Sequence, residues 1–166
     1  MITPEEFVKI YLPEALKEEK RSGFHHLIPL TQGALESAWG TKAIGNNFFG
    51  IKDTDGVNGN EQLITTTEYL SSDKVKFPVV LKIVKIGNKF KYTIKDWFRK
   101  YPSAALGFAD HTDFFIRNPR YAKALLVKND PSKFFDEIAK AGYATDPTYA
   151  KQLKQVMNSV IKRIPK

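Results

Sequence analysis

The stretch Ala34-Leu35-Glu36-Ser37-Ala38-Trp39-Gly40 holds one carboxylate inside an apolar run. Apolar residues recur at near-helical spacing over residues 27–39, and the closing glycine suits the position just after a helix end. The pattern predicts a helix with Glu36 in its last turn and Gln32 one turn earlier on the same face.

This position favours the protonated form of Glu36. A carboxylate in the last turn of a helix faces the negative end of the helix dipole. Leu35 and Trp39 are expected to keep water away from it. Both effects raise the pKa of a carboxyl group, which a proton donor at neutral pH requires. A lone glutamate late in a helix is more often a solvated surface residue, so the rest of the chain has to decide between the two interpretations.

The composition is that of one globular domain. A chain of 166 residues, 42% hydrophobic and 27% charged, can bury a core. No apolar run approaches the roughly 20 residues that a membrane-spanning helix needs. Because there is no cysteine, disulfides, thiolate metal sites and a cysteine nucleophile are excluded. We expect a single domain over residues 1–166 and no membrane insertion.

The net charge of +8 predicts a surface that attracts polyanions. Nucleic acid is one such partner, and the bacterial wall, with its carboxylates and phosphate polymers, is another. The chain has no recognised nucleic-acid motif, so we expect no nucleic acid as a partner. Its first six residues lack the basic start and apolar block of a signal peptide.

The N-terminal segment predicts a helix that starts with a capping box at Thr3-Pro4-Glu5-Glu6. Pro13 is expected to kink or split this helix. The charged cluster at residues 17–21 is expected to be a solvated helix end. His25-His26 follows, and with three histidines and no cysteine in the chain we favour a surface or capping role over a metal site.

The middle of the chain predicts strands. Residues 62–70 are rich in β-branched residues, and residues 79–86 and 89–99 form a hairpin around a Gly87-Asn88 turn. In the last strand apolar residues alternate with lysines, so one face is expected to pack and the other to be wet and basic. The loop 53–60 resembles a calcium loop but has Asn58 where that loop needs glycine, which favours a flexible turn.

The C-terminal half predicts further helices. One opens at Pro102-Ser103 and runs to about Arg117, and a short one covers 121–127. Asp130-Pro131 and Asp146-Pro147 each predict an N-cap followed by proline at the first helical position. The whole pattern predicts one α+β domain.

Several segments, taken in chain order, form a set of motifs. After the stretch around Glu36 come Asn47-Phe48-Phe49-Gly50-Ile51-Lys52, Thr66-Thr67-Glu68-Tyr69 and Gly142-Tyr143-Ala144-Thr145-Asp146-Pro147-Thr148-Tyr149. Shorter matches are Leu12-Pro13-Glu14-Ala15, Phe98-Arg99-Lys100-Tyr101-Pro102-Ser103 and Arg120-Tyr121. In this order the chain closely resembles the endo-β-N-acetylglucosaminidase domain of bacterial cell-wall hydrolases. This is glycoside hydrolase family 73, which includes autolysins and the flagellar peptidoglycan hydrolase.

The resemblance implies a lysozyme-like fold, mainly a helical lobe with a small inserted β-lobe. The hairpin at 79–99 is longer than the family pattern leads us to expect. The implied function is a bacteriolytic peptidoglycan hydrolase that cleaves the GlcNAc-β-1,4-MurNAc linkage with Glu36 as the general acid. The implied partner is the glycan strand of peptidoglycan, with no cofactor or metal, and we expect a monomer. Such a domain acts on the cell wall, whether secreted, periplasmic or phage-delivered.

The resemblance leaves the second catalytic group open between Glu68 and Tyr143. If Glu68 activates water, the reaction inverts and the two carboxyls stand about 6.5–9.5 Å apart, whereas a nucleophile needs about 5–5.5 Å. In a third route the 2-acetamido group of the substrate is the nucleophile, and Tyr143 orients it. The other residues expected to bind substrate are Trp39, Asn47, Phe49, Tyr69, Tyr121, Asp146 and Tyr149. About half of these aromatics are expected to be structural.

Two other functions fit parts of the pattern. A muramidase or lytic transglycosylase of the lysozyme-like group is the nearest rival, although the Ile51-Lys52 pair after Gly50 and the Thr67-Glu68-Tyr69 segment favour the glucosaminidase. A non-catalytic wall-binding module is the other, and the presence of Glu36 and Glu68 argues against it.

Overall fold

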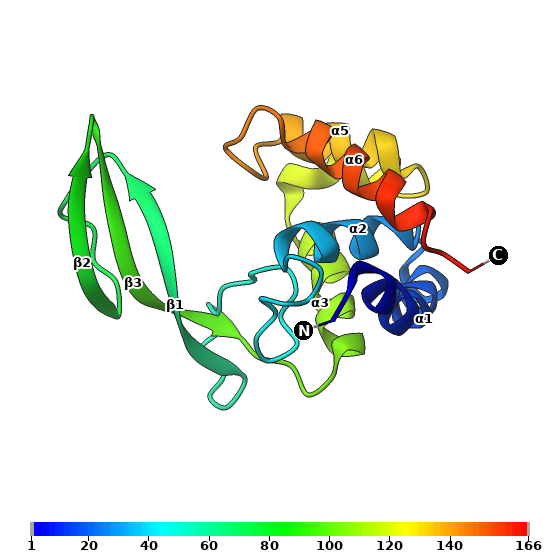
Figure 1. The fold of residues 1–166 in the computed structure, drawn as a ribbon, viewed down its shortest axis with the longest axis horizontal. Coiled ribbons are helices and arrows are strands. Elements are labelled where there is room, and N and C mark those ends of the chain that lie inside the picture. Colours follow the sequence, from blue (N-terminus) through cyan, green and yellow to red (C-terminus); the bar gives the residue numbers. More distant parts are fainter. Residues whose placement is uncertain (1, 166) are drawn as a thin grey trace. The chain divides into compact units, whose positions relative to one another are not determined.

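A computed structural model describes residues 2–165 (Figure 1). The helices are α1 (Pro4–Ser22), α2 (Leu27–Glu36), α3 (Ala104–Arg117), α4 (Ala122–Leu125), α5 (Pro131–Lys140) and α6 (Tyr149–Ile161), with a 3-10 helix η1 (Pro119–Tyr121). The strands are β1 (Glu61–Leu70), β2 (Val79–Ile86) and β3 (Lys89–Arg99). No helix in the described region is both long and apolar enough to cross a bilayer.

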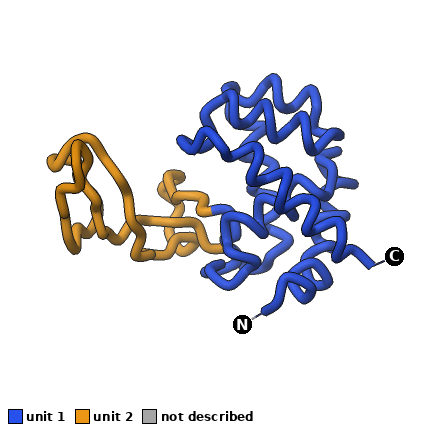
Figure 2. Tube along the Cα trace, turned by 45° about the horizontal axis from the view of Figure 1, so that its top comes forward, with its two compact units in different colours: residues 1–49, 101–166 blue, residues 50–100 orange. Residues whose placement is uncertain are grey.

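The chain forms two compact units, shown in two colours in Figure 2. Residues 1–49 and 101–166 make the helical unit, and residues 50–100 make the sheet unit. The sheet unit is therefore an insertion between α2 and α3, as predicted for an α+β chain of this pattern.

Helix α1 confirms the predicted capping box. The Glu6 amide donates to the Thr3 hydroxyl at 3.2 Å, and the Thr3 amide donates to the Glu6 carboxylate at 2.7 Å. Gly23 ends the helix in the left-handed conformation, which glycine adopts without a steric cost. The helix continues through Pro13, so it is not split there.

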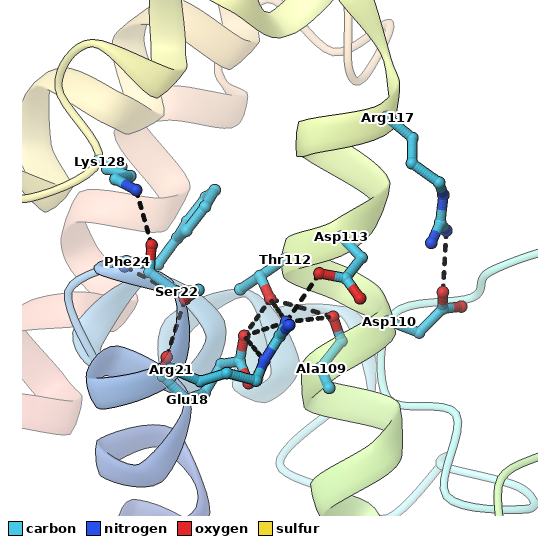
Figure 3. A network of polar contacts seen from close by, with 10 residues as sticks. All are labelled: Glu18, Arg21, Ser22, Phe24, Ala109, Asp110, Thr112, Asp113, Arg117 and Lys128. Atoms are coloured by element: carbon cyan, nitrogen blue, oxygen red, sulfur yellow. Dashed lines mark hydrogen bonds and ion pairs between the residues drawn. The ribbon is translucent and has the colours of Figure 1, made fainter.

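A buried carboxylate joins α1 to α3. Glu18 is 4% exposed and accepts hydrogen bonds from the Arg21 guanidinium and the Thr112 hydroxyl (Figure 3). Arg21 also pairs with Asp113 at 2.7 Å. The prediction of a solvated charge cluster at 17–21 is therefore wrong for Glu18, because α3 covers that side of α1 and Thr112 supplies a partner.

Removing the arginine from this network is expected to destabilise the fold. Arg21→Met should lower the free energy of unfolding by about 2–3 kcal/mol, because it leaves the Glu18 carboxylate buried without its cation. This is below the usual cost for a buried pair, since Arg21 is about half exposed and water can reach the vacated position. Chemical denaturation measures the change.

Lys17→Met is the matched control for Arg21→Met. Lys17 lies on the same helix and pairs with the carboxylate three residues before it, Glu14, but its side chain is 71% exposed. Its replacement should change stability by less than about 0.5 kcal/mol. An equal loss from both substitutions would contradict the account of the Glu18 network.

The core of the helical unit is built from aromatic side chains of α3, α5 and the α1–α2 connection. The Phe115 ring contacts Phe24, Tyr121 and Phe134 at centroid distances of 5.0 to 6.3 Å. Ile28 of α2 and Leu153 of α6 close the same cluster, and both are fully buried. This packing fixes α2 and α6 against each other.

The sheet unit confirms the predicted hairpin and its turn. Strand order is β1-β3-β2, all antiparallel, and Ile86 pairs with Lys89 across Gly87-Asn88. Tyr92 and Ile94 on β3 are fully buried. The connection 71–78 covers them: the Tyr92 hydroxyl donates to the Ser72 carbonyl at 3.0 Å. The opposite face carries lysines, so the predicted division into a packed and a basic face is confirmed.

The carboxylate of Asp55 is held by groups of its own loop, 53–60, and by one arginine. Asp55 accepts from the Val57 amide at 2.8 Å and from the Asn60 side chain at 3.1 Å, and it pairs with Arg99 at 2.9 Å. The arginine supplies the positive charge that a cation would supply in a calcium loop. The arrangement supports the turn that the sequence favoured.

Candidate active site

Glu36 is the last residue of α2, three residues before the predicted end of the helix. Ala38, Trp39 and Gly40 follow with positive φ angles of 50°, 58° and 81°. Two non-glycine residues in this conformation cost free energy. Ser37 holds the turn: its hydroxyl donates to the Gly33 carbonyl at 2.5 Å and accepts from the Gly40 amide at 2.7 Å. Gly40 therefore closes a left-handed turn and does not terminate α2 itself.

Three side chains bind the Glu36 carboxyl group. The Tyr149 hydroxyl donates to Oε1 at 2.7 Å, and the Tyr143 hydroxyl lies 3.4 Å from Oε2. Gln32, one turn earlier on α2, places its amide nitrogen 3.4 Å from Oε1 and 3.1 Å from the Tyr149 hydroxyl. Tyr149 begins α6 and Tyr143 lies between α5 and α6, so both come from the far end of the chain.

Burial raises the pKa of Glu36 to about 7, and the hydrogen bonds from Tyr149, Tyr143 and Gln32 oppose that rise without cancelling it. The direction of this shift agrees with the predicted rise in pKa, and tyrosines from the C-terminal segment enclose the carboxyl group. Glu36 as a whole residue is half-buried, so it is not completely closed off from solvent. A carboxyl group with this pKa carries a proton on about half of the molecules at neutral pH.

The two tyrosines form a rigid, neutral wall beside the carboxyl group. Their rings stack at 5.5 Å with 17° between planes, and Tyr143 also stacks on Phe115 at 5.6 Å. Burial and the nearby Glu36 charge raise the pKa of both phenols, so they stay protonated and act as hydrogen-bond donors. Tyr149 was predicted to bind sugar; in the structure it binds Glu36.

Glu68 belongs to the sheet unit and has its own partners there. Lys52 places Nζ 3.4 Å from the Glu68 carboxylate and 2.8 Å from Asp96. Sequence patterns offered no reason to select Lys52 or Asp96, because their pairing depends on the bridge between Lys52 and Phe98 of β3. Alternation along β1 puts Glu68 on the same sheet face as the buried Tyr92, with which it pairs.

Comparisons with known proteins identify the family of this chain. The family described as mannosyl-glycoprotein endo-beta-N-acetylglucosaminidase matches residues 12–162. The chain belongs to this glucosaminidase family. It is 33% identical over 164 residues to the peptidoglycan hydrolase FlgJ of Vibrio parahaemolyticus, covering 95% of this chain and 48% of that protein. It is 27% identical to the exo-glucosaminidase LytG of Bacillus subtilis, covering 80% of this chain and 44% of that protein.

A solved structure also matches the glucosaminidase fold of this chain. The glycoside hydrolase domain of Salmonella typhimurium FlgJ superposes with a TM-score of 0.70 at 28% identity, covering 97% of this chain and 90% of that one. The lysozyme-like α+β fold and the assignment as a glycoside hydrolase domain are thereby confirmed. The chain spans about half the length of the curated relatives that it matches.

Two aromatics predicted from the glucosaminidase motifs lie in the core. Phe48 and Phe49 are 2% and 4% exposed, so Phe49, which was expected to bind substrate, offers almost no surface to a sugar. Phe49 stacks on His111 at 3.8 Å. Burial lowers the pKa of His111 to about 3, which keeps that ring neutral beside Phe49. Asn47 is 7% exposed, and its side-chain oxygen accepts from the Phe49 amide at 3.4 Å.

Three further residues expected to bind substrate have structural contacts. Trp39 meets the Phe7 ring edge-on at 5.9 Å and the Arg163 guanidinium at 5.5 Å. Tyr121 is 1% exposed and so offers no surface to a sugar. Asp146 is not the N-cap of α6, which begins at Tyr149; its carboxylate accepts from the Thr148 amide at 2.7 Å. Asp146 thereby fixes the turn that delivers Tyr149.

One group of side chains in the described region has donors suited to a metal. Glu19, His25 and His26 each place one donor atom within 4.8 Å of the others. His26 Nδ1 already lies 2.7 Å from Glu19, and His25 Nδ1 accepts from the Leu27 amide at 3.2 Å. His25 thereby satisfies one amide of the first turn of α2, which fits the surface or capping role expected for this pair, although the N-cap residue itself, His26, makes no side-chain capping bond.

Proposed function

We propose that this glucosaminidase domain hydrolyses the GlcNAc-β-1,4-MurNAc linkage of peptidoglycan, with Glu36 as the general acid. The observation that carries the proposal is the state of the Glu36 carboxyl group at the half-buried end of α2. Its pKa is about 7, and two neutral tyrosines, Tyr149 and Tyr143, hold it. The name of the Vibrio relative, a peptidoglycan hydrolase, supports the choice of substrate.

The geometry around Glu36 fits the step that such a reaction needs. The glycosidic oxygen leaves as the 4-hydroxyl of N-acetylmuramic acid, and it requires a proton as the bond to the anomeric carbon breaks. Glu36 supplies this proton and becomes a carboxylate. Tyr149, with its hydrogen bond of 2.7 Å, fixes the carboxyl group and then stabilises the new negative charge.

Product analysis tests the linkage and the mode of attack. We expect digestion of purified peptidoglycan, followed by borohydride reduction and mass analysis, to give fragments of several disaccharide units that end in reduced N-acetylglucosamine. Reduced N-acetylmuramic acid would identify a muramidase instead, and an anhydro sugar a lytic transglycosylase. Release of single sugars from chain ends would identify exo action, which the name of the Bacillus relative describes.

Glu68 is proposed as the second catalytic group, the base that activates water. Removal of a general base costs about 100- to 10,000-fold in rate, and we expect Glu68→Gln to lose at least about 100-fold in kcat on peptidoglycan. Glu61→Gln is the matched control, because Glu61 lies on β1 but, seven residues away, on the opposite face of the strand. A loss of less than about fivefold in Glu68→Gln would exclude the base and favour the acetamido route with Tyr143.

A further inference from the structure

The sheet unit has a second face, opposite Glu68, that holds neither of the proposed catalytic groups; Tyr69, which the family motifs led us to expect at the substrate, lies on this face. We call it the lysine face. The register places Leu63 beside Trp97, and Tyr69 beside Lys91, on this side of β1 and β3. On β2, Lys82 pairs with Thr93 and Val84 with Lys91. The complete face consists of Leu63, Thr65, Thr67, Tyr69, Val79, Lys82, Val84, Ile86, Lys89, Lys91, Thr93, Lys95 and Trp97.

The lysine face is open along its length. Tyr69 is 55% exposed and Trp97 is 41% exposed, whereas Tyr92 on the opposite face is fully buried under the connection 71–78. The row at Trp97 and the row at Tyr69 are six residues apart, which spans about 20 Å along the strands. Two aromatic rings therefore stand at the two ends of an uncovered strip.

Much of the positive charge of the chain is carried by this part of the sheet unit, on both of its faces. Residues 71–95 hold seven lysines and one aspartate, in a chain whose net charge is +8. Between the row of Leu63 and Trp97 and the turn at Gly87, the lysine face has four lysines and no carboxylate. Four cations on one exposed face attract an anionic partner, because its charge relieves the Lys–Lys repulsion that solvent and salt only partly screen.

The remaining side chains define the kind of anion. Aromatic faces pack on the apolar faces of sugar rings, and threonine hydroxyls form hydrogen bonds with sugar hydroxyls. Lys91 lies 6.0 Å from the centre of the Tyr69 ring, so one aromatic surface and one cation meet in the same place. A second copy of the chain is a poor partner for β2, since Lys82 and Lys85 on this edge strand oppose edge-to-edge pairing.

We propose that the lysine face binds an anionic polysaccharide of the cell wall, independently of the Glu36 site. The wall as the source of this polymer rests on the proposed function; the anionic and saccharide character rests on the lysines, threonines and rings of the face. Such a surface holds the domain on its insoluble substrate between cleavage events and raises the local concentration of linkages.

Binding to insoluble peptidoglycan tests the proposal, and the test uses Glu36→Gln as background so that the polymer is not degraded. The face variant carries Lys82→Glu and Lys91→Glu. We expect its dissociation constant in co-sedimentation to rise at least about tenfold. The neutral pair Lys82→Gln and Lys91→Gln should show a smaller loss in the same direction, and circular dichroism checks that each variant folds.

The control variant carries Lys9→Glu and Lys20→Glu, two exposed lysines of α1, and so has the same change in net charge. It should bind peptidoglycan like the background protein. Equal losses in the two variants, or no loss in the face variant, would overturn the proposal. Stronger binding to anionic lipid vesicles or duplex DNA than to peptidoglycan would also overturn it. Uncharged chitin should bind more weakly than peptidoglycan.

The two proposals fail in different experiments. If the wild-type protein released no fragments from peptidoglycan, the proposed function would fall, while the binding result with the Glu36→Gln background would stand. If the face variant bound peptidoglycan normally, the lysine face would have no such role, while hydrolysis by the wild-type protein would be unaffected.

Discussion

Glu36→Gln is expected to reduce hydrolysis of peptidoglycan by about 1,000-fold or more while the protein remains folded. Glutamine has nearly the same shape and can still accept the Tyr149 hydrogen bond, but it has no proton to give to the glycosidic oxygen. The loss should appear in kcat, because the substitution removes an interaction made in the transition state and leaves sugar binding in place. Initial rates on a soluble peptidoglycan fragment measure it.

Glu137→Gln is the control for this substitution. Glu137 on α5 is paired with Lys140 on the surface of the same unit, and its replacement should leave the rate within a factor of two. Residual turnover of Glu36→Gln above about a tenth of the wild-type rate would contradict the assignment of the acid.

The second large effect is on stability, and it depends on pH. The pKa of Glu36 is about 7 in the folded protein and 4.5 is its ordinary value, so the folded state holds the proton more tightly than the unfolded state. The stability that this proton provides is complete below about pH 4.5 and is lost as the pH rises through about 7. Glu36→Gln carries no such dependence.

Glu36→Gln should therefore become more stable than the wild type as the pH rises. The difference should grow from near zero at pH 4.5 to at most about 3 kcal/mol above pH 8, since one pKa unit is worth about 1.4 kcal/mol. Denaturant unfolding of both proteins between pH 4.5 and pH 8.5 measures it. A constant difference across this range would mean that Glu36 titrates at its ordinary pKa.

Local signals were sufficient to predict much of the fold. The capping box at Thr3, the Gly87-Asn88 turn, and the alternation of apolar residues and lysines on β3 each act over a few residues, and each is confirmed. Asp130 likewise caps α5, through a hydrogen bond from the Lys133 amide. These features depend on backbone geometry that the local residue types determine.

The details that were wrong depend on contacts across the chain. The burial of Glu18 depends on Thr112 of α3, and the burial of Phe49 depends on His111 of the same helix. The Ser37 hydroxyl holds the left-handed turn at Ala38 and Trp39. The contact of the Trp39 ring with Phe7 offsets part of the free-energy cost of this backbone conformation. Neither local propensity nor periodicity reports such partners.

In the candidate site, too, some features could be predicted from local residues and others depend on contacts across the chain. The chemical character of Glu36 followed from its place at the end of an apolar helix. Its enclosure by Tyr149, 113 residues later, requires α6 to return to α2, which only the packed core determines. The family motifs did bring Glu36, Tyr143 and Tyr149 to attention together, and the structure shows that one hydrogen-bonded cluster connects them.

The role of Glu36 as the general acid is tested most directly by a titration of its carboxyl group by carbon NMR, with the side-chain carboxyls labelled and the signal assigned by its absence in Glu36→Gln. We expect a midpoint near pH 7, which gives the protein a proton donor at neutral pH. A midpoint near the ordinary value of 4.5 would show that Glu36 is ionised at neutral pH and would contradict its role as the acid.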